Sequence, residues 1–321
     1  MTSCDQPTHS GKEKVATNSN TTTKDNEAEL NIPKESAGID SIASTLISVF
    51  DHAGIVALGE SHGHFKMDLD LWISLIKNSA FRKKVRSIVV EFASTTEQST
   101  LDRYIRGENV SKAQLEQVWK TTTQASTGVW DNPIYMDFFE AVREVNSKLP
   151  VASQIRVLGG DPGPDDKRSR EVAALSVLKE QVLDNGEKAL IIYGASHFYR
   201  TVPEEYLSSM GDDIGLVRRL EKDLPVKIFV VIPIGLLDRP SAVKKEDIVP
   251  DLKKFDTAIK TQLRPVMVSL QRSPFRDLTA EEFLGRTLTT CRGANGCVSV
   301  FKGSPITLHE IADACIYVGG Q

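Results

Sequence analysis

The sequence predicts an α/β fold in which helices flank a mostly parallel β-sheet and a helical cap is inserted. Two observations support this prediction. Short apolar runs rich in Val and Ile alternate along the chain with segments of helical periodicity, as expected for right-handed βαβ units. The apolar runs are nearly continuous rather than alternating with polar residues, which indicates strands that are covered on both faces.

The expected elements follow one another from residue 39 onward. The first strand, over 54–58, is a brief apolar run that ends at Gly59. A helix is expected over 166–183, with Asp165 or Asp166 as its N-cap. The other helices are expected over 39–50, 64–78 and 214–224, and the other strands over 87–93, 154–159, 188–193, 226–234, 265–270, 298–301 and 315–318.

Two regions depart from this alternation. Residues 1–38 are mostly Thr, Asn, Ser, Lys and Glu and show no hydrophobic periodicity, so we expect a disordered polar tail before a single α/β domain over 39–321. The stretch of about 96–149 is too long for one crossover connection and has the periodicity of three helices. We therefore interpret this stretch as a helical cap inserted over the sheet.

The composition argues against nucleic-acid binding and against a membrane span. The 321-residue chain has a net charge of −4 and a pI of about 5.9, whereas a nucleic-acid-binding surface needs a basic patch. No segment is long and apolar enough to form a transmembrane helix. The oligomeric state is left open.

The cysteines leave the compartment open. Cys4 precedes a long polar tether, as in a bacterial lipoprotein after removal of its signal, so the protein is either exported and lipid-anchored there or cytoplasmic with a flexible tail. Cys291 and Cys297 flank a turn-like sequence and form either a small disulfide loop or two reduced thiols.

Ionisable side chains lie at the ends of four expected strands. Glu60 and His62 follow the first strand, Glu91 lies within the second, Asp161 follows the third and His197 follows the fourth. Ligands of open parallel sheets bind beyond the carboxyl ends of the strands, so these side chains are expected to converge on one crevice. We predict that all of them except Asp161 are catalytic.

Residue chemistry supports these assignments. A carboxylate in a buried apolar strand costs free energy unless it is paired, so Glu91 is either functional or the partner of a buried Arg or of helix-end amides. His62 and His197 share a Gly-x-x-His pattern directly after a strand, and histidine suits general base catalysis because its pKa lies near neutrality. Glu60 is expected to orient a histidine or a water molecule; the alternative is an acid at a helix N-terminus.

Three more residues are expected to contact substrate. His64 begins a helix, Tyr135 lies with Trp130 and Asp131 in the expected cap, and Asp161 lies in a Gly-Gly-Asp-Pro sequence that also suits a turn. The chain has no phosphate-binding loop and no Gly-x-Ser-x-Gly nucleophile elbow, which argues against a P-loop NTPase and a serine hydrolase of the α/β-hydrolase type.

Three motifs of the chain are Leu-Gly-Glu-Ser-His-Gly over 58–63, Val-Val-Glu-Phe over 89–92 and Tyr-Gly-Ala-Ser-His-Phe over 193–198. In this order they resemble the superfamily that contains erythromycin esterases, ChaN-like haem-binding lipoproteins and the Tiki/TraB proteins. The resemblance covers about Ile55 to Gly319, and it implies site roles for His62, Glu91 and His197, with Glu60 beside them. Shorter similar segments lie at 101–104, 118–119, 135–143 and 312–319.

This resemblance implies three alternative activities. Erythromycin esterases hydrolyse a macrolactone ester with a His-activated water and no metal, Tiki-type members are metal-dependent proteases, and ChaN-like members bind haem. The spacing from Gly59 to His62 is closer to the ChaN and Tiki pattern, because erythromycin esterases usually place one more residue between Glu and His. Shared fold does not decide the chemistry.

We therefore predict a hydrolase of an ester, lactone or amide bond. His62 would activate water, and Glu60 or Glu91 would hold the imidazole or the water. His197 would stabilise the oxyanion or protonate the leaving group. A divalent-metal variant would use His62, Glu91 and His197, with Asp161 as a further ligand. The alternative of another class is a protein that binds haem or iron in the same crevice, so the partner is a small-molecule substrate or haem.

Overall fold

A computed structural model defines the part of the chain from residue 33 onward. The compact unit of the chain spans Ile32–Gln321. Residues 1–31 precede it and lie outside the described residues, so the lipid anchor at Cys4 stays a prediction. The described residues are 33–63, 66–210, 215–235, 252–284, 289–291 and 297–319, with the backbone alone for 208–210, 289–291 and 297–299.

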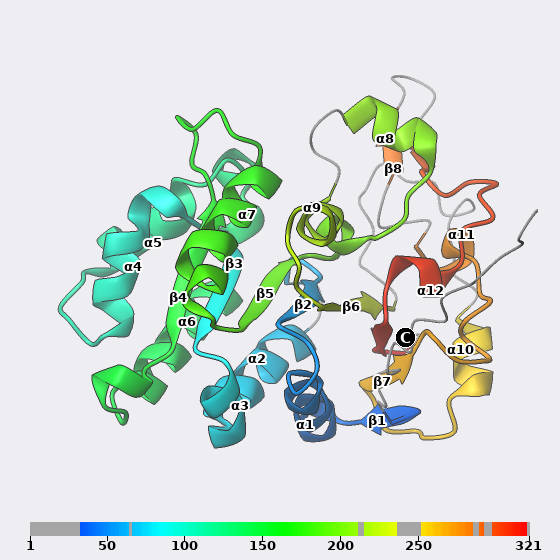
Figure 1. Cartoon of the computed structure of the whole chain (residues 1–321), viewed down its shortest axis with the longest axis horizontal. Coiled ribbons are helices and arrows are strands. Elements are labelled where there is room, and N and C mark those ends of the chain that lie inside the picture. Colours follow the sequence, from blue (N-terminus) through cyan, green and yellow to red (C-terminus); the bar gives the residue numbers. More distant parts are fainter. Residues whose placement is uncertain are drawn as a thin grey trace, which may run out of the picture. The chain divides into compact units, whose positions relative to one another are not determined.

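The strands form one large sheet and one small sheet (Figure 1). In chain order they are β1 (Glu35–Ala37), β2 (Ile55–Glu60), β3 (Ser87–Ser94), β4 (Arg156–Asp161), β5 (Ala189–Gly194), β6 (Ile228–Ile234), β7 (Val266–Ser269), β8 (Thr289–Cys291), β9 (Cys297–Ser299) and β10 (Ala314–Tyr317). The large sheet has eight strands in the order β1-β7-β10-β6-β2-β5-β3-β4. Strand β7 is antiparallel to both of its neighbours, and the other pairs are parallel. The predicted, mostly parallel α/β fold is therefore confirmed.

Strand β1 corrects the predicted end of the polar tail. We expected residues 1–38 to be disordered, but β1 pairs with the edge of the sheet, with Glu35 opposite Val268 and Ala37 opposite Val266. The side chain of Ser36, at the centre of β1, is buried, and its hydroxyl oxygen lies 2.7 Å from the hydroxyl oxygen of Thr45. The α/β domain thus begins a few residues earlier than predicted.

Helices cover both faces of the sheet (Figure 1). None of those in the described part of the chain has the length and hydropathy that a membrane span requires. The α-helices are α1 (Ile39–Val49), α2 (Met67–Lys77), α3 (Ser79–Lys84), α4 (Gln98–Ile105), α5 (Lys112–Lys120), α6 (Pro133–Asn146), α7 (Arg170–Gln181), α8 (Glu204–Met210), α9 (Leu216–Asp223), α10 (Lys253–Ala258), α11 (Ala280–Leu284) and α12 (Leu308–Ile311).

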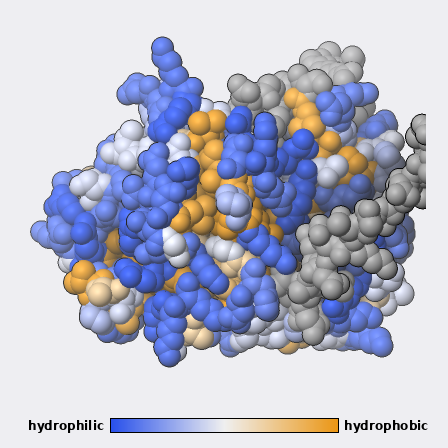
Figure 2. All heavy atoms as spheres, in the orientation of Figure 1, coloured by the Kyte–Doolittle hydropathy of each residue, from blue (hydrophilic) through white to orange (hydrophobic). Residues whose placement is uncertain are grey.

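The two faces of the sheet are packed differently. On one face, α1, α2 and α6 form a layer, and Trp72 of α2 stacks on Phe92 of β3 with ring centroids 5.7 Å apart. On the other face, Leu178 of α7 and Leu220 of α9 belong to the same buried cluster as Ile191 of β5. Each such side chain contributes about 1.5–3 kcal/mol by burial. The face shown in Figure 2 is largely hydrophilic, with apolar residues gathered near its middle.

The insertion between β3 and β4 holds the three predicted helices α4, α5 and α6. Helix α4 packs along β4, and α6 packs against α2, so α6 also belongs to the helical layer on that face. Between α5 and α6 lie two 3-10 turns, η2 (Ala125–Thr127) and η3 (Val129–Asp131). Helix α6 begins with Pro133 after Asn132, whose side chain accepts a hydrogen bond from the Ile134 N–H.

Helix α7 begins later than predicted. We expected Asp165 or Asp166 to be its N-cap, but the N-cap is Ser169, whose hydroxyl accepts a hydrogen bond from the Val172 N–H. The Asp166 carboxylate instead pairs with the guanidinium of Arg168 at 2.6 Å. The later start places Arg170 and Glu171 in the first turn of α7, and the side chains of both reach the site described below.

The small sheet contains two of the cysteines. Cys291 and Cys297 are register partners in the antiparallel pair of β8 and β9. Register partners in antiparallel strands have Cα atoms about 4.5–5.5 Å apart, which is within the range that a disulfide requires. The disulfide loop, one of the two alternatives drawn from the sequence, is therefore compatible with the backbone, and the choice between it and two reduced thiols stays open.

Candidate functional site

Four neighbouring strands place the candidate site at one edge of the sheet. Strand β2 ends at Glu60, which is the register partner of Gly194 at the end of β5. Strand β3 carries Glu91 near its carboxyl end, and β4 ends at Asp161. His197 follows β5 in a short 3-10 helix, η6 (Ala195–Phe198). The structure thus brings the predicted residues to the same edge of the sheet.

Glu60 and His62 form a carboxylate–imidazole pair. The Oε1 atom of Glu60 lies 2.5 Å from Nδ1 of His62, and Oε2 accepts a hydrogen bond of 2.6 Å from the backbone N–H of His62. The Glu60 side chain is buried, whereas 39% of the His62 side chain is exposed. No described residue bonds to Nε2 of His62. The pair therefore fixes one ring nitrogen and leaves the other available.

The backbone of His62 is strained. His62 has a φ of 54°, and among the described residues it is the one non-glycine residue with a positive φ. Such a conformation costs on the order of 1–3 kcal/mol and is typical of functional sites. Burial lowers the pKa of His62, but the hydrogen bond and the charge of Glu60 raise it more, so the pKa lies above its usual 6.5.

Glu91 is the centre of a buried charge network. Its Oε1 accepts a hydrogen bond of 2.6 Å from Nη1 of Arg170 and lies 3.2 Å from Nε2 of His197. Its Oε2 accepts a hydrogen bond of 2.7 Å from the N–H of Gly194. Burial raises the pKa of Glu91, but the charge of His197 and its hydrogen bond, with Arg170 and His62, lower it to about 2. Glu91 therefore has an Arg partner, one of the alternatives that the sequence left open, although the Arg170 side chain is 27% exposed and not buried.

His197 lies between two carboxylates. Its Nδ1 is 2.7 Å from Oε1 of Glu171, and its Nε2 faces Glu91. Burial lowers the pKa of His197, but the charge of Glu91 and the hydrogen bond to Glu171 raise it to about 9. The same pairing lowers the pKa of Glu171 to about 2 despite its burial. At neutral pH, His197 is an imidazolium with both N–H groups occupied.

The sequence analysis missed Arg170 and Glu171. Both lie in the first turn of α7, which packs against β4 and points its N-terminus at the carboxyl edge of the sheet. With Asp166 as the N-cap, Arg170 and Glu171 would lie in the second turn of the helix. Residues in that turn were not expected to reach the carboxyl ends of the strands. The signal that could have found them was Ser169, a good N-cap followed directly by an Arg-Glu pair.

The insertion contacts the same site through one short segment. Tyr135, predicted to contact substrate, is fully buried and donates a hydrogen bond of 3.3 Å to Oε2 of Glu60. The ring of Trp130 packs edge-to-face on the His62 ring, with centroids 5.2 Å apart. Asn132 donates to the carbonyl of Gly63 at 3.4 Å. The segment from Trp130 to Tyr135 thus touches the turn after β2 at three positions.

The other two predicted substrate contacts differ from each other. His64 lies outside the described residues. Asp161 is buried, and its Oδ1 accepts hydrogen bonds from the N–H groups of Thr123 and Gly163, both at 2.8 Å. Its Oδ2 accepts a bond of 2.5 Å from the Thr123 hydroxyl. Asp161 therefore ties the insertion to the end of β4, and its contact with substrate stays a prediction.

A second buried carboxylate supports the turn after β2. The Oδ2 atom of Asp68, in the first turn of α2, accepts hydrogen bonds from the N–H of Ser61 at 3.1 Å and from its hydroxyl at 2.6 Å. Burial and the charge of Glu60 raise the pKa of Asp68 to about 7, against the opposing effect of the Ser61 hydrogen bonds. The sequence analysis missed Asp68, because acidic residues are common in the first turn of a helix and the sequence does not show that this one is buried.

Three of the site residues lie close enough together to be considered as a metal site. One donor atom each from Glu60, His62 and Glu91 lies within 4.8 Å of the others, so the structure groups Glu60 with them in place of the predicted His197. The oxygens of Glu91 already accept from Arg170, His197 and a backbone N–H. The two positive groups beside Glu91 oppose a divalent cation, so these residues do not fit one. His197 also has no nitrogen left for haem.

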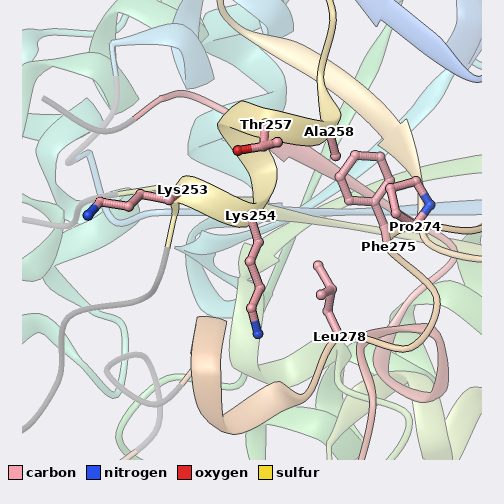
Figure 3. A pocket seen from close by; sticks show the side chains of 7 residues that line it. All are labelled: Lys253, Lys254, Thr257, Ala258, Pro274, Phe275 and Leu278. Atoms are coloured by element: carbon pink, nitrogen blue, oxygen red, sulfur yellow. The ribbon is translucent and has the colours of Figure 1, made fainter.

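A surface pocket lies elsewhere on the domain. Helix α10 lines it with Lys253, Lys254, Thr257 and Ala258, and the segment after β7 adds Pro274, Phe275 and Leu278. Figure 3 shows Lys253 extending away from the apolar side chains. None of these residues belongs to the site at the ends of β2, β3 and β5.

Comparison with solved structures identifies the fold. No protein-family model matches the sequence, and no curated protein matches it. A Bacillus cereus protein of known crystal structure is 12% identical, with a TM-score of 0.56 over 88% of this chain and 92% of that one. A succinoglycan biosynthesis protein is 10% identical, with a TM-score of 0.56 over 89% and 94%. An erythromycin esterase variant in its open conformation is 10% identical, with a TM-score of 0.53 over 88% and 94%. The chain therefore shares the α/β fold of erythromycin esterase.

Proposed function

We propose that this protein is a hydrolase that cleaves an ester, lactone or amide bond with water activated by His62. The observation that carries the proposal is the 2.5 Å contact between Glu60 Oε1 and Nδ1 of a partly exposed His62 at a strand end. A buried carboxylate on one ring nitrogen leaves the other nitrogen to act as a general base.

The geometry supports a defined role for each member of the pair. Nε2 of His62 takes a proton from water as the water oxygen attacks the carbonyl carbon. When the tetrahedral intermediate collapses, the carbon–oxygen or carbon–nitrogen bond to the leaving group breaks and the His62 imidazolium returns the proton to the leaving atom. The imidazolium that forms is stabilised by Glu60, whose charge already raises the pKa of His62. Tyr135 and the backbone N–H of His62 hold the other carboxylate oxygen, so Glu60 keeps its orientation. The base is therefore preorganised, which spares the reaction the entropy of aligning it.

The Glu91 network supports an electrostatic role rather than a basic one. His197 has a pKa of about 9 and is protonated at neutral pH, so it does not act as a base there. The charge of His197 acts on His62, and the His62 ring and the Glu91 carboxylate both lie beside Gly194. Fixed positive groups of this kind stabilise a carbonyl oxygen as it becomes negative. Because both N–H groups of His197 already face carboxylates, the predicted oxyanion-stabilising role of His197 would act through its charge and not through a hydrogen bond.

The other predicted activities receive less support. A Tiki-like metal protease requires a cation beside Glu91, where Arg170 and His197 already lie. Haem binding through two histidines requires His197 to give up one of its carboxylate partners. For both reasons the metal-free hydrolase is the function that the site supports best.

The test compares His62→Gln with His52→Gln, a matched variant of an exposed histidine outside the site. The wild-type chain is assayed with p-nitrophenyl acetate, a lactone panel and an amide panel, with and without EDTA. We expect turnover that survives EDTA, a loss of about 10²–10⁴-fold in kcat for His62→Gln, and no loss for His52→Gln. Equal activity of the two variants, or no turnover of any substrate, would overturn the proposal.

A further inference from the structure

Trp130 has a polar group that the proposed reaction does not yet use. The residue lies in η3 and is 2% exposed, and its ring packs on His62 and on Tyr135 with centroid distances of 5.2 Å in both cases. Its indole N–H is buried and has no acceptor among the described residues. Buried donors are nearly always satisfied, and exceptions call for a water or a ligand.

The neighbours of the indole ring indicate the side from which a hydrogen-bond acceptor can approach its N–H. Phe92 and Tyr135 pack against the ring on the side of the helical layer, and neither supplies an acceptor to it. The Tyr135 hydroxyl is already directed to Glu60. Among the ring neighbours of Trp130, Phe92 and Tyr135 are fully buried, whereas the His62 side chain is 39% exposed. The His62 side is therefore where a ligand from solvent comes nearest to the indole.

The segment that carries Trp130 is held in place. Asn132 bonds both to the first turn of α6 and to the Gly63 carbonyl. The ideal Cβ position of Gly63 lies 2.3 Å from Nδ2 of Asn132, so the turn and the segment are in direct contact. Trp130 is thus fixed against the same turn that positions His62.

We propose that the indole N–H of Trp130 and the imidazole of His62 together bind one oxygen-bearing ligand, with the N–H donating to its oxygen. The shared chemistry is an oxygen acceptor, which is either a water molecule or the carbonyl or carboxylate oxygen of a substrate or product. The inference rests on the proposed role of His62 and makes Trp130 a second ligand-contacting residue.

The first test needs no turnover. The full chain is labelled with ¹⁵N-tryptophan, which gives three indole signals because the chain has three Trp residues. The Trp130 signal is assigned by its loss in Trp130→Phe or, if that variant does not fold, by its through-space contact to the His62 ring. Acetate, a small carboxylate, is then titrated into the wild type and into His62→Gln.

Each outcome decides the inference. A Trp130 signal that moves to saturation with acetate in the wild type, but not in His62→Gln, supports a substrate or product oxygen. A signal that ignores acetate but exchanges magnetisation with bulk water supports a bound water. A signal that does neither shows an indole that is only packed, and overturns the inference. None of these results depends on hydrolysis, so failure of the hydrolase proposal is distinguishable from failure here.

Kinetics give a second readout. Trp130→Phe keeps most of the ring and removes the N–H, and we expect kcat/KM to fall about 3- to 10-fold, as for loss of one hydrogen bond. Trp119→Phe is the matched control, because Trp119 is also a buried tryptophan of the insertion and lies in α5, whereas the tryptophan that packs on the His62 ring is Trp130. An equal effect of the two substitutions would show a structural role for Trp130 and would contradict the inference.

Discussion

The two Gly-x-x-His turns share a local pattern but have different surroundings. In the turn after β2, His62 has positive φ, one carboxylate partner and a side chain that is 39% exposed. In the turn after β5, His197 lies in a 3-10 helix, has two carboxylate partners and is 13% exposed. The same spacing therefore produces an available imidazole in one turn and a largely buried imidazolium in the other.

The difference teaches that the pattern places a histidine but does not set its charge. Helix α7 brings Glu171 and Arg170 to the second turn, whereas the insertion brings aromatic and amide groups to the first turn. A charged environment fixes His197 as a cation, and an apolar wall with a single carboxylate leaves His62 titratable. Assignments of catalytic roles from the repeated motif alone would treat the two residues as equivalent.

The largest expected effect is a difference in the free energy of unfolding between variants of the two histidines. His197→Gln leaves the buried carboxylates of Glu91 and Glu171 without their shared cation, so we expect a loss of about 3–5 kcal/mol in the free energy of unfolding. His62→Gln leaves the buried Glu60 carboxylate with its bonds from Tyr135 and from a backbone N–H and changes a partly exposed ring, so the expected loss is smaller, about 1–2 kcal/mol. Urea unfolding of both variants checks this, and equal losses would contradict the comparison.

The pH dependence sharpens the same contrast. The pKa of His197 rises from 6.5 to about 9 on folding, so its contribution is fully present below pH 6.5 and is lost as the pH rises through 9. The difference in unfolding free energy between wild type and His197→Gln should therefore shrink by about 1.4 kcal/mol per pH unit across this window. Urea titrations at several pH values measure it. A difference that stays constant from pH 6.5 to 9 would show that His197 is neutral in the folded protein.

The smallest expected effect concerns the first glycine of each turn. The ideal Cβ position of Gly194 lies 2.7 Å from Cε1 of His62, whereas that of Gly59 lies 3.0 Å from Ala195 and 3.1 Å from the Val231 carbonyl. We expect both alanine variants to lose about 1–3 kcal/mol by overpacking. Only Gly194→Ala should also displace the His62 ring and lower kcat. Urea unfolding with an ester assay tests this, and an equal loss of kcat in Gly59→Ala would refute it.

The convergence of Glu60, His62, Glu91 and His197 was predictable from the sequence. Parallel strands with both faces covered leave their carboxyl ends at one edge, and the motifs follow those strands directly. Their charge states were not predictable, because the deciding groups come from α7, about 80 residues after Glu91. The Asp-rich turn before α7 offered several good N-caps, and residue type alone does not choose among them.

The elements of the fold were also only partly predictable from the sequence. The periodic helices of the insertion and the long apolar strands were predicted, because each carries many residues that follow one pattern. Strand β1 was not predicted, since three residues with a single buried side chain show no periodicity. Its pairing with β7 depends on a partner that lies more than 200 residues away.

The strand order has a consequence for the nascent chain. Strand β5 lies between β2 and β3 in the sheet but is synthesised about 100 residues after β3. Until residues 189–194 emerge from the ribosome, the strands that carry Glu60 and Glu91 have no common neighbour and expose unpaired edges. The edge that carries the candidate site is therefore among the last parts of this half to form, and a chain truncated before β5 would carry both motifs without bringing them together.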